Sequence, residues 1–133
     1  MARRPASVAF PRRGNVYIVD FDPVVGSEIA KTRPAVVIQN DISNRYSAVT
    51  IVAAISSRIT NPPYPNEVLI RPPEGGLKVD SSVRLNQIRT VDKQRLRKHV
   101  GKMSPATMRR VDQAIRNSLG LISFVTPRPP SVP

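Results

Sequence analysis

The chain has 133 residues, a formal net charge of +12 at pH 7 and no cysteine. This length suits one domain, and the lack of thiols excludes disulfides and thiolate metal sites. The charge favours a polyanionic partner such as nucleic acid or an acidic protein. No apolar run could span a bilayer and the N-terminus lacks the apolar core of a signal peptide, so we expect a soluble cytoplasmic protein with no membrane partner.

The only histidine is His99, and this limits the chemistry available to the chain. A ribonuclease with paired imidazoles needs one as base and one as acid, and a histidine-rich metal site needs several. The signatures of nucleotide-driven, zinc-dependent and serine-hydrolase enzymes are absent. We expect neither a metal nor a cofactor, and we interpret His99 as a surface residue. Basic residues between 89 and 110 predict a solvated face that also suits a phosphate backbone.

The first part of the chain predicts short strands. Residues 1–12 are rich in arginine and predict a flexible basic arm. Alternation over 14–22 predicts a strand, and the β-branched runs at 34–39 and 49–55 predict two buried strands. The segment 23–32 predicts a long loop, and loops of this length are often functional.

The middle of the chain continues this pattern. Residues 41–46 predict a helical turn capped by Asp41 or Ser43. A proline-rich stretch ends before a short predicted strand at 67–71. Residues 82–91 predict a long strand, in which a bulge could switch faces and turn Gln87 sideways.

The last part of the chain predicts one clear helix. Residues 95–103 are compatible with either a strand or a helical turn. Ser104, followed by proline, predicts a helix start, and Gly120 predicts its end after an apolar stripe. Residues 124–133 predict a proline-rich extended tail. Residues 13–123 are therefore expected to form one mainly β domain, a small strongly curved sheet or barrel with a C-terminal helix.

Four residues at strand ends and in loops could carry chemistry. We expect a loop to deliver Arg33 to the mouth of a core strand, where it could bind phosphate or be a solvated charge. Ser56 ends the next buried strand, where its hydroxyl could meet a phosphate or only terminate the strand. Glu28 could take a proton, hydrogen-bond a base or be only an exposed loop carboxylate, and Gln87 could read a base edge or cross-link strands.

Several segments resemble, in order and spacing, the MazF/PemK family of toxin endoribonucleases, or mRNA interferases. The resemblance covers about residues 12–122. It rests on the segments 13–28 (RGNVYIVDFDPVVGSE), 32–41 (TRPAVVIQND), 50–56 (TIVAAIS), 87–96 (QIRTVDKQRL) and 111–121 (VDQAIRNSLGL).

This resemblance implies a small SH3-like barrel with a C-terminal helix, as in MazF, PemK and CcdB, acting as a homodimer. It implies metal-independent, sequence-specific cleavage of single-stranded RNA, without a cofactor, to 2′,3′-cyclic phosphate and 5′-OH ends. It also implies an acidic MazE-like antitoxin whose C-terminal segment fills the RNA groove. A gyrase poison like CcdB and a non-catalytic RNA-binding barrel are alternative interpretations.

The catalytic arginine of the family falls on Arg33, and its catalytic hydroxyl, commonly a threonine, falls on Ser56. Serine keeps the hydroxyl donor but lacks the methyl group that restricts χ1. The reaction needs an aligned 2′-OH and stabilisation of the negative charge on the phosphate. Arg33 could supply positive charge, and Ser56 could donate a hydrogen bond to a non-bridging oxygen. We expect four further residues to contact RNA: Glu28, Gln87, Lys31 and Thr32.

Overall fold

The computed structural model describes residues 10–28 and 31–122. The predicted tail, 124–133, and all but the last three residues of the predicted arm, 1–12, lie outside these residues. The limits of the domain, 13–123, therefore stay a prediction.

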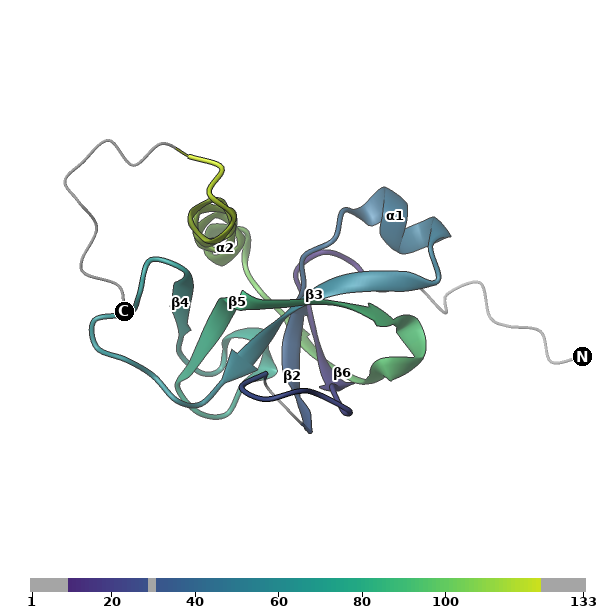
Figure 1. Ribbon diagram of the computed structural model, residues 1–133, viewed down its shortest axis with the longest axis horizontal. Helices are drawn as coiled ribbons and strands as arrows, with labels where there is room; N and C mark the ends of the chain where they lie inside the picture. Colours follow the sequence, from purple (N-terminus) through teal and green to yellow (C-terminus); the bar gives the residue numbers. More distant parts are fainter. Residues whose placement is uncertain (1–9, 29–30, 123–133) are drawn as a thin grey trace, which may run out of the picture.

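The described residues form six strands, two α-helices and two short 3-10 helices (Figure 1). None of these helices is long and apolar enough to cross a membrane. The prediction of a mainly β fold with one late helix is confirmed. The elements are β1 (Asn15–Asp20), β2 (Thr32–Val37), α1 (Asp41–Tyr46), β3 (Val49–Ser56), β4 (Glu67–Ile70), η1 (Glu74–Gly76), β5 (Ser81–Asp92), η2 (Lys93–Arg95), β6 (Leu96–Lys102) and α2 (Pro105–Leu119).

Within the described residues, the strands form one antiparallel sheet in the order β4-β5-β3-β2-β1-β6. The sheet curves strongly, but β4 and β6 do not pair, so the predicted barrel is not closed by hydrogen bonds. At this gap η1 packs closely on β6. The approach is so close that a Cβ atom on Gly101 would lie only 2.6 Å from the Gly75 carbonyl carbon. The segment 95–103, which allowed a strand or a helical turn, contains the end of η2 and all of β6.

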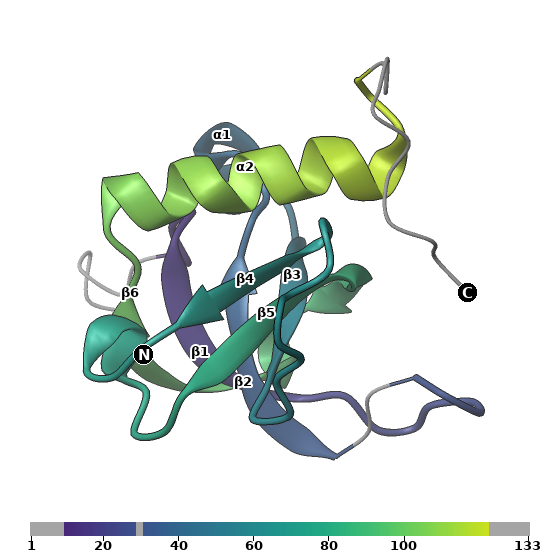
Figure 2. The same ribbon diagram turned by 90° about the vertical axis from the view of Figure 1, so that its left-hand side faces the viewer.

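The sheet has an apolar core on each face. Figure 2 shows α2 lying across one face, near β4 and β5, where Val111 and Ala114 of the helix join Val36, Ala53 and Leu85 of the strands. Residues that alternate with these point to the opposite face, which we call the site face. The site face has its own buried core: Val19, Phe21, Ala35, Val37, Val52, Ala54 and Val91.

A bulge makes β5 change face part of the way along. Two consecutive residues of β3 pair with Ile88 and Arg84 of β5, so residues 85–87 are inserted without partners on β3. Because the number of inserted residues is odd, the residues after the bulge point to the opposite faces from those that the alternation before the bulge would give. Leu85 consequently belongs to the core beneath α2, while Gln87 shares the alternation of Val91 on the site face. The predicted bulge is confirmed.

The helix α2 begins and ends where the sequence predicts. The Ser104 Oγ accepts a hydrogen bond from the Thr107 N–H at 3.1 Å, and Gly120 takes the left-handed conformation with φ of 70°. The predicted apolar stripe is buried at Val111. It does not extend to Leu119 in the last turn, which is 58% exposed.

Two local predictions were wrong. Arg33 lies inside β2 rather than on a loop, because Pro34 is accommodated in the strand where pairing with β3 has not yet begun. The cap of α1 is Asn40, not Asp41 or Ser43, since the Asn40 Oδ1 accepts a hydrogen bond from the Ser43 N–H at 2.8 Å.

Candidate active site

Three neighbouring strands bring predicted site residues to the site face. Arg33 on β2 alternates with the buried Ala35, and Ser56 on β3 alternates with the buried Ala54. Ala35 pairs with Ala54, so extending this register by two residues places Arg33 opposite Ser56. Both side chains therefore lie on the site face, at the end of β2 and β3 that lies beyond their last paired residues. Gln87 reaches the same face through the bulge of β5.

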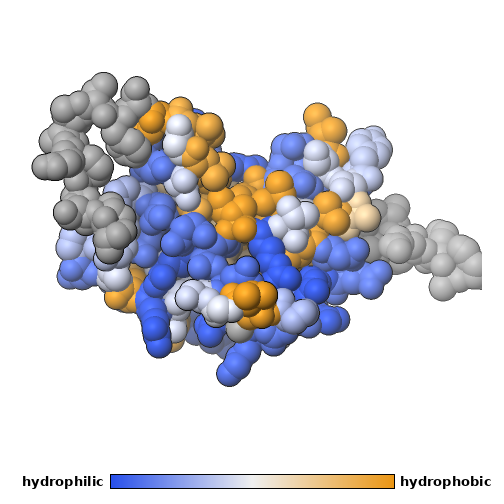
Figure 3. Space-filling view, viewed as in Figure 1, coloured by the Kyte–Doolittle hydropathy of each residue, from blue (hydrophilic) through white to orange (hydrophobic). Residues whose placement is uncertain are grey.

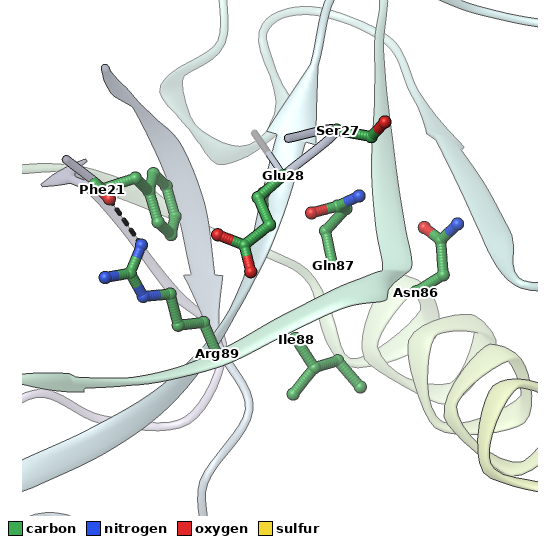
Figure 4. Close-up of a pocket in the computed structure, with 8 residues that line it drawn as sticks. Phe21, Ser27, Glu28, Asn86, Gln87, Ile88 and Arg89 are labelled. Carbon is green, nitrogen blue, oxygen red and sulfur yellow. Dashed lines mark hydrogen bonds between the residues drawn. The ribbon is translucent and has the colours of Figure 1, made fainter. Parts of the chain in front are cut away.

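A cavity of about 490 Å³ opens on the site face beside the bulge. Figure 4 shows the Glu28 carboxylate directed toward the space between Phe21 and Gln87. A carboxylate, two amides and a guanidinium thus line the cavity above the buried Phe21 ring, and these polar groups suit the hydrogen-bonding edges of an unpaired base. The cavity is lined by Phe21, Ser27, Glu28, Ala54, Asn86, Gln87, Ile88 and Arg89.

Glu28 is held by its own loop. The Val25 N–H donates to the Glu28 Oε1 at 2.8 Å, and the Glu28 N–H donates to the Val25 carbonyl at 3.2 Å. This small turn orders the carboxylate that enters the cavity.

Arg89, which the sequence places in the basic stretch 89–110, also lines the cavity. Its Nη1 donates to the Phe21 carbonyl (Figure 4), and its guanidinium carbon lies 5.9 Å from the centre of the Phe21 ring. The two-residue spacing from Gln87 is the signal that could have identified it. Asn86 reaches the cavity only through the bulge, and no pattern in the sequence indicates its position.

Ser56 is largely buried, with 8% of its surface exposed. Its Oγ accepts a hydrogen bond from the Arg58 N–H at 3.1 Å. Because this contact uses a lone pair of the oxygen, the hydroxyl proton can still be donated to a substrate oxygen.

Lys31 and Thr32 do not line the cavity, and both are exposed. Thr32 alternates with Arg33, so it belongs to the opposite side of β2. The Lys31 backbone has φ of 70°, and its N–H donates to the Asp22 Oδ1 at 2.8 Å. Contacts of these two residues with RNA stay a prediction.

His99 is exposed on β6, as the sequence predicts. Its ring meets the Tyr17 ring edge to face, with centroids 5.2 Å apart. In the part of the chain that the structure describes, no three histidine or carboxylate side chains gather as metal ligands.

The chain was compared with protein families and with known proteins, and the matches point to a single family. Residues 12–119 match the family described as PemK-like, MazF-like toxins of type II toxin–antitoxin systems. The chain is 47% identical over 113 residues to endoribonuclease EndoA of Bacillus subtilis (strain 168), covering 85% of this chain and 97% of that protein.

Solved structures agree with this assignment. One is a mycobacterial endoribonuclease in complex with its cognate antitoxin, with 26% identity, a TM-score of 0.70 and coverage of 86% of this chain and 99% of that one. MazF from Deinococcus radiodurans has the same fold, with 23% identity, a TM-score of 0.72 and coverage of 84% and 97%. The predicted membership is confirmed: the chain belongs to the PemK-like, MazF-like toxins of type II toxin–antitoxin systems.

Proposed function

We propose that this toxin is a cytoplasmic endoribonuclease that cleaves single-stranded RNA, including mRNA, at specific sequences. The observation that carries the proposal is the site face, where Arg33, Ser56 and Gln87 come from three adjacent strands beside the cavity that Glu28 enters. Similarity to EndoA and to the mycobacterial endoribonuclease supports the reaction class.

The proposed chemistry is transesterification without a metal ion. The ribose 2′-OH loses its proton and attacks the adjacent phosphorus, the bond to the 5′ oxygen breaks, and that oxygen gains a proton. The products are a 2′,3′-cyclic phosphate and a 5′-OH. Arg33 binds the non-bridging oxygens with its guanidinium donors, and Ser56 donates its hydroxyl to one of them as negative charge develops. Arg33 acts through the positive charge and the fixed donor geometry of its guanidinium.

Glu28 and Gln87 select the RNA sequence. The Glu28 carboxylate accepts from base amino groups, and the Gln87 amide both donates and accepts at a base edge. Lys31 and Thr32, exposed where the loop joins β2, contact the part of the RNA that continues past this end of the site face.

Two protein partners complete the proposal. A net charge of +12 suits an acidic MazE-like antitoxin whose C-terminal segment fills the RNA groove, and the similar mycobacterial structure contains a cognate antitoxin. The second partner is another copy of the chain. Figure 3 shows a band of apolar side chains between α2 and α1, and the exposed Ile42, Leu119 and Leu121 support a homodimer that covers such a surface.

The test is cleavage of a long single-stranded RNA by the purified protein, with and without EDTA, followed by mapping of the ends. We expect discrete sites with 5′-OH ends and the same pattern in EDTA. Arg33→Ala should lower kcat on the order of 10²–10³-fold. Arg116→Ala, an exposed charge on α2 outside the basic stretch 89–110, should cleave like the parent.

Three outcomes would contradict the proposal. Full activity of Arg33→Ala would remove this residue from the reaction. Intact RNA together with gyrase-dependent DNA breaks would make the protein a gyrase poison. RNA that is bound but never cut would make it a binding barrel.

A further inference from the structure

The Ser56 hydroxyl is held by a chain of contacts that leads away from the cavity. Its Oγ accepts from the Arg58 N–H at 3.1 Å, and the Arg58 carbonyl accepts from the Arg84 Nη2 at 2.5 Å. The backbone of Arg58 is therefore fixed on both sides, by Ser56 and by the Arg84 guanidinium. A serine needs such a constraint more than a threonine does, because it lacks the γ-methyl group that restricts χ1.

Among the described residues, Arg84 also forms an ion pair, though no hydrogen bond through its Nε, with a carboxylate that the proposed reaction does not use. It precedes the bulge of β5 and lies opposite Glu67 on the edge strand β4. The Arg84 Nε lies 3.5 Å from the Glu67 Oε2, and the two side chains are only 21% and 6% exposed. An ion pair shielded from water is less screened than a surface pair and keeps its geometry better.

Glu67 also holds the connection between β3 and β4. Its Oε1 accepts from the Thr60 hydroxyl at 2.8 Å and from the Tyr64 N–H at 3.2 Å. The segment that follows Ser56 is thus fastened to one shielded carboxylate at several points.

Ser82 shows why the direction of the Ser56 hydroxyl needs control. It lies directly opposite Ser56 on β5, is buried, and its hydroxyl has no hydrogen-bond partner. A buried hydroxyl without a partner is costly, so it favours any Ser56 rotamer that would bond to it. The contact from the Arg58 N–H opposes this rotation.

We propose that Arg84, held by Glu67, is a positioning residue for Ser56. It fixes the backbone of Arg58, whose N–H directs the Ser56 hydroxyl toward the scissile phosphate. Arg84 acts only through this turn. The inference rests on the proposed function, in which Ser56 is the phosphate donor.

The first test compares Arg84→Met with Arg71→Met in cleavage of an RNA that contains one mapped site. Arg71 is a matched control, because it also lies 3.5 Å from a carboxylate, that of Asp80, but is 73% exposed. We expect Arg84→Met to lower kcat by about 10-fold to 100-fold with little change in KM, since a misplaced donor weakens transition-state contacts. Arg71→Met should match the parent.

The second test asks whether Arg84 acts through Ser56. In a Ser56→Ala background, Arg84→Met should lower kcat by less than about twofold, because the donor is already absent. In a Ser56→Thr background the loss should shrink, since the γ-methyl group restricts χ1. An equal loss in all backgrounds would overturn the proposal.

The third test needs no RNA. Hydrogen exchange at the Arg58 amide should be faster in Arg84→Met than in Arg71→Met, and unchanged exchange would overturn the proposal. A parent protein that cuts no RNA would contradict the proposed function instead, while this exchange result would still decide the role of Arg84. If Arg84→Met does not fold, Glu67→Gln, which removes the charge that holds Arg84, replaces it, and the changes in kcat and in Arg58 amide exchange are expected in the same direction.

Discussion

Ser56 is the single residue on which the proposed chemistry can be tested most directly. Its hydroxyl is one donor to the phosphate, so Ser56→Ala should lower kcat on the order of 10²–10³-fold. Ser56→Thr keeps the donor and should stay within about threefold of the parent, because the added methyl group restricts χ1 rather than removing the contact. Single-turnover cleavage of a short RNA measures both.

The neighbouring serine provides the control for Ser56. Ser57 is exposed and follows β3 directly. Ser57→Ala removes the same atom one residue away and should cleave like the parent. An active Ser56→Ala would transfer the role of phosphate donor to another group.

At the scale of the element, the start of α2 predicts how stability depends on pH. The Ser104 N–H donates to the Glu74 Oε2 at 2.9 Å, which ties the helix to η1. Burial acts to raise the pKa of Glu74, but hydrogen bonds from Thr107 and Ser104 and the charge of Arg110 together hold that pKa below the ordinary value.

A carboxyl with a lowered pKa in the folded state stabilises the fold above its unfolded pKa, about 4.3. This contribution is lost as the pH falls through the folded pKa. We therefore expect Glu74→Gln to have a lower Tm than the parent at pH 7, and the difference to narrow below about pH 4. Thermal unfolding followed by circular dichroism from pH 3 to 7 measures this. A constant difference over that range would contradict the role of the Glu74 charge.

Most of the secondary-structure elements could be predicted from the sequence. The strands and α2 follow from alternation, caps and apolar spacing, which are local properties of the chain. The bulge could be foreseen, but its length could not, so the positions of Asn86 and Arg89 in the cavity were missed. The pairing of Arg84 with Glu67 depends on the register between β4 and β5, which pattern alone does not specify.

Part of the candidate site could likewise be predicted from the sequence, and part could not. Arg33 and Ser56 were named through a family resemblance, and their common face follows from two-residue alternation once β2 is known to include Arg33. The loop assignment of Arg33 was wrong because a proline usually excludes a paired strand, whereas β2 pairs with β3 only after Pro34.

For the whole molecule, net charge is the property with the widest consequence. Twenty-one lysines and arginines against nine acidic residues give the +12 charge. Both proposed partners, RNA and an acidic antitoxin, are polyanions, so the same charge attracts them to one protein. Affinity for RNA should then depend strongly on salt, because each phosphate contact releases counterions.

This salt dependence can be measured with Ser56→Ala, which keeps every charge of the parent and should bind RNA without rapid cleavage. We expect the logarithm of the association constant to fall linearly with the logarithm of salt concentration, with a slope of about −0.7 for each phosphate contacted on a single strand. Fluorescence anisotropy of a labelled RNA gives the slope. Adding Arg33→Ala should make the slope less steep by about 0.7, since one phosphate contact is lost, whereas Arg116→Ala should leave it unchanged. An affinity that does not respond to salt would exclude backbone charge as the main source of RNA binding.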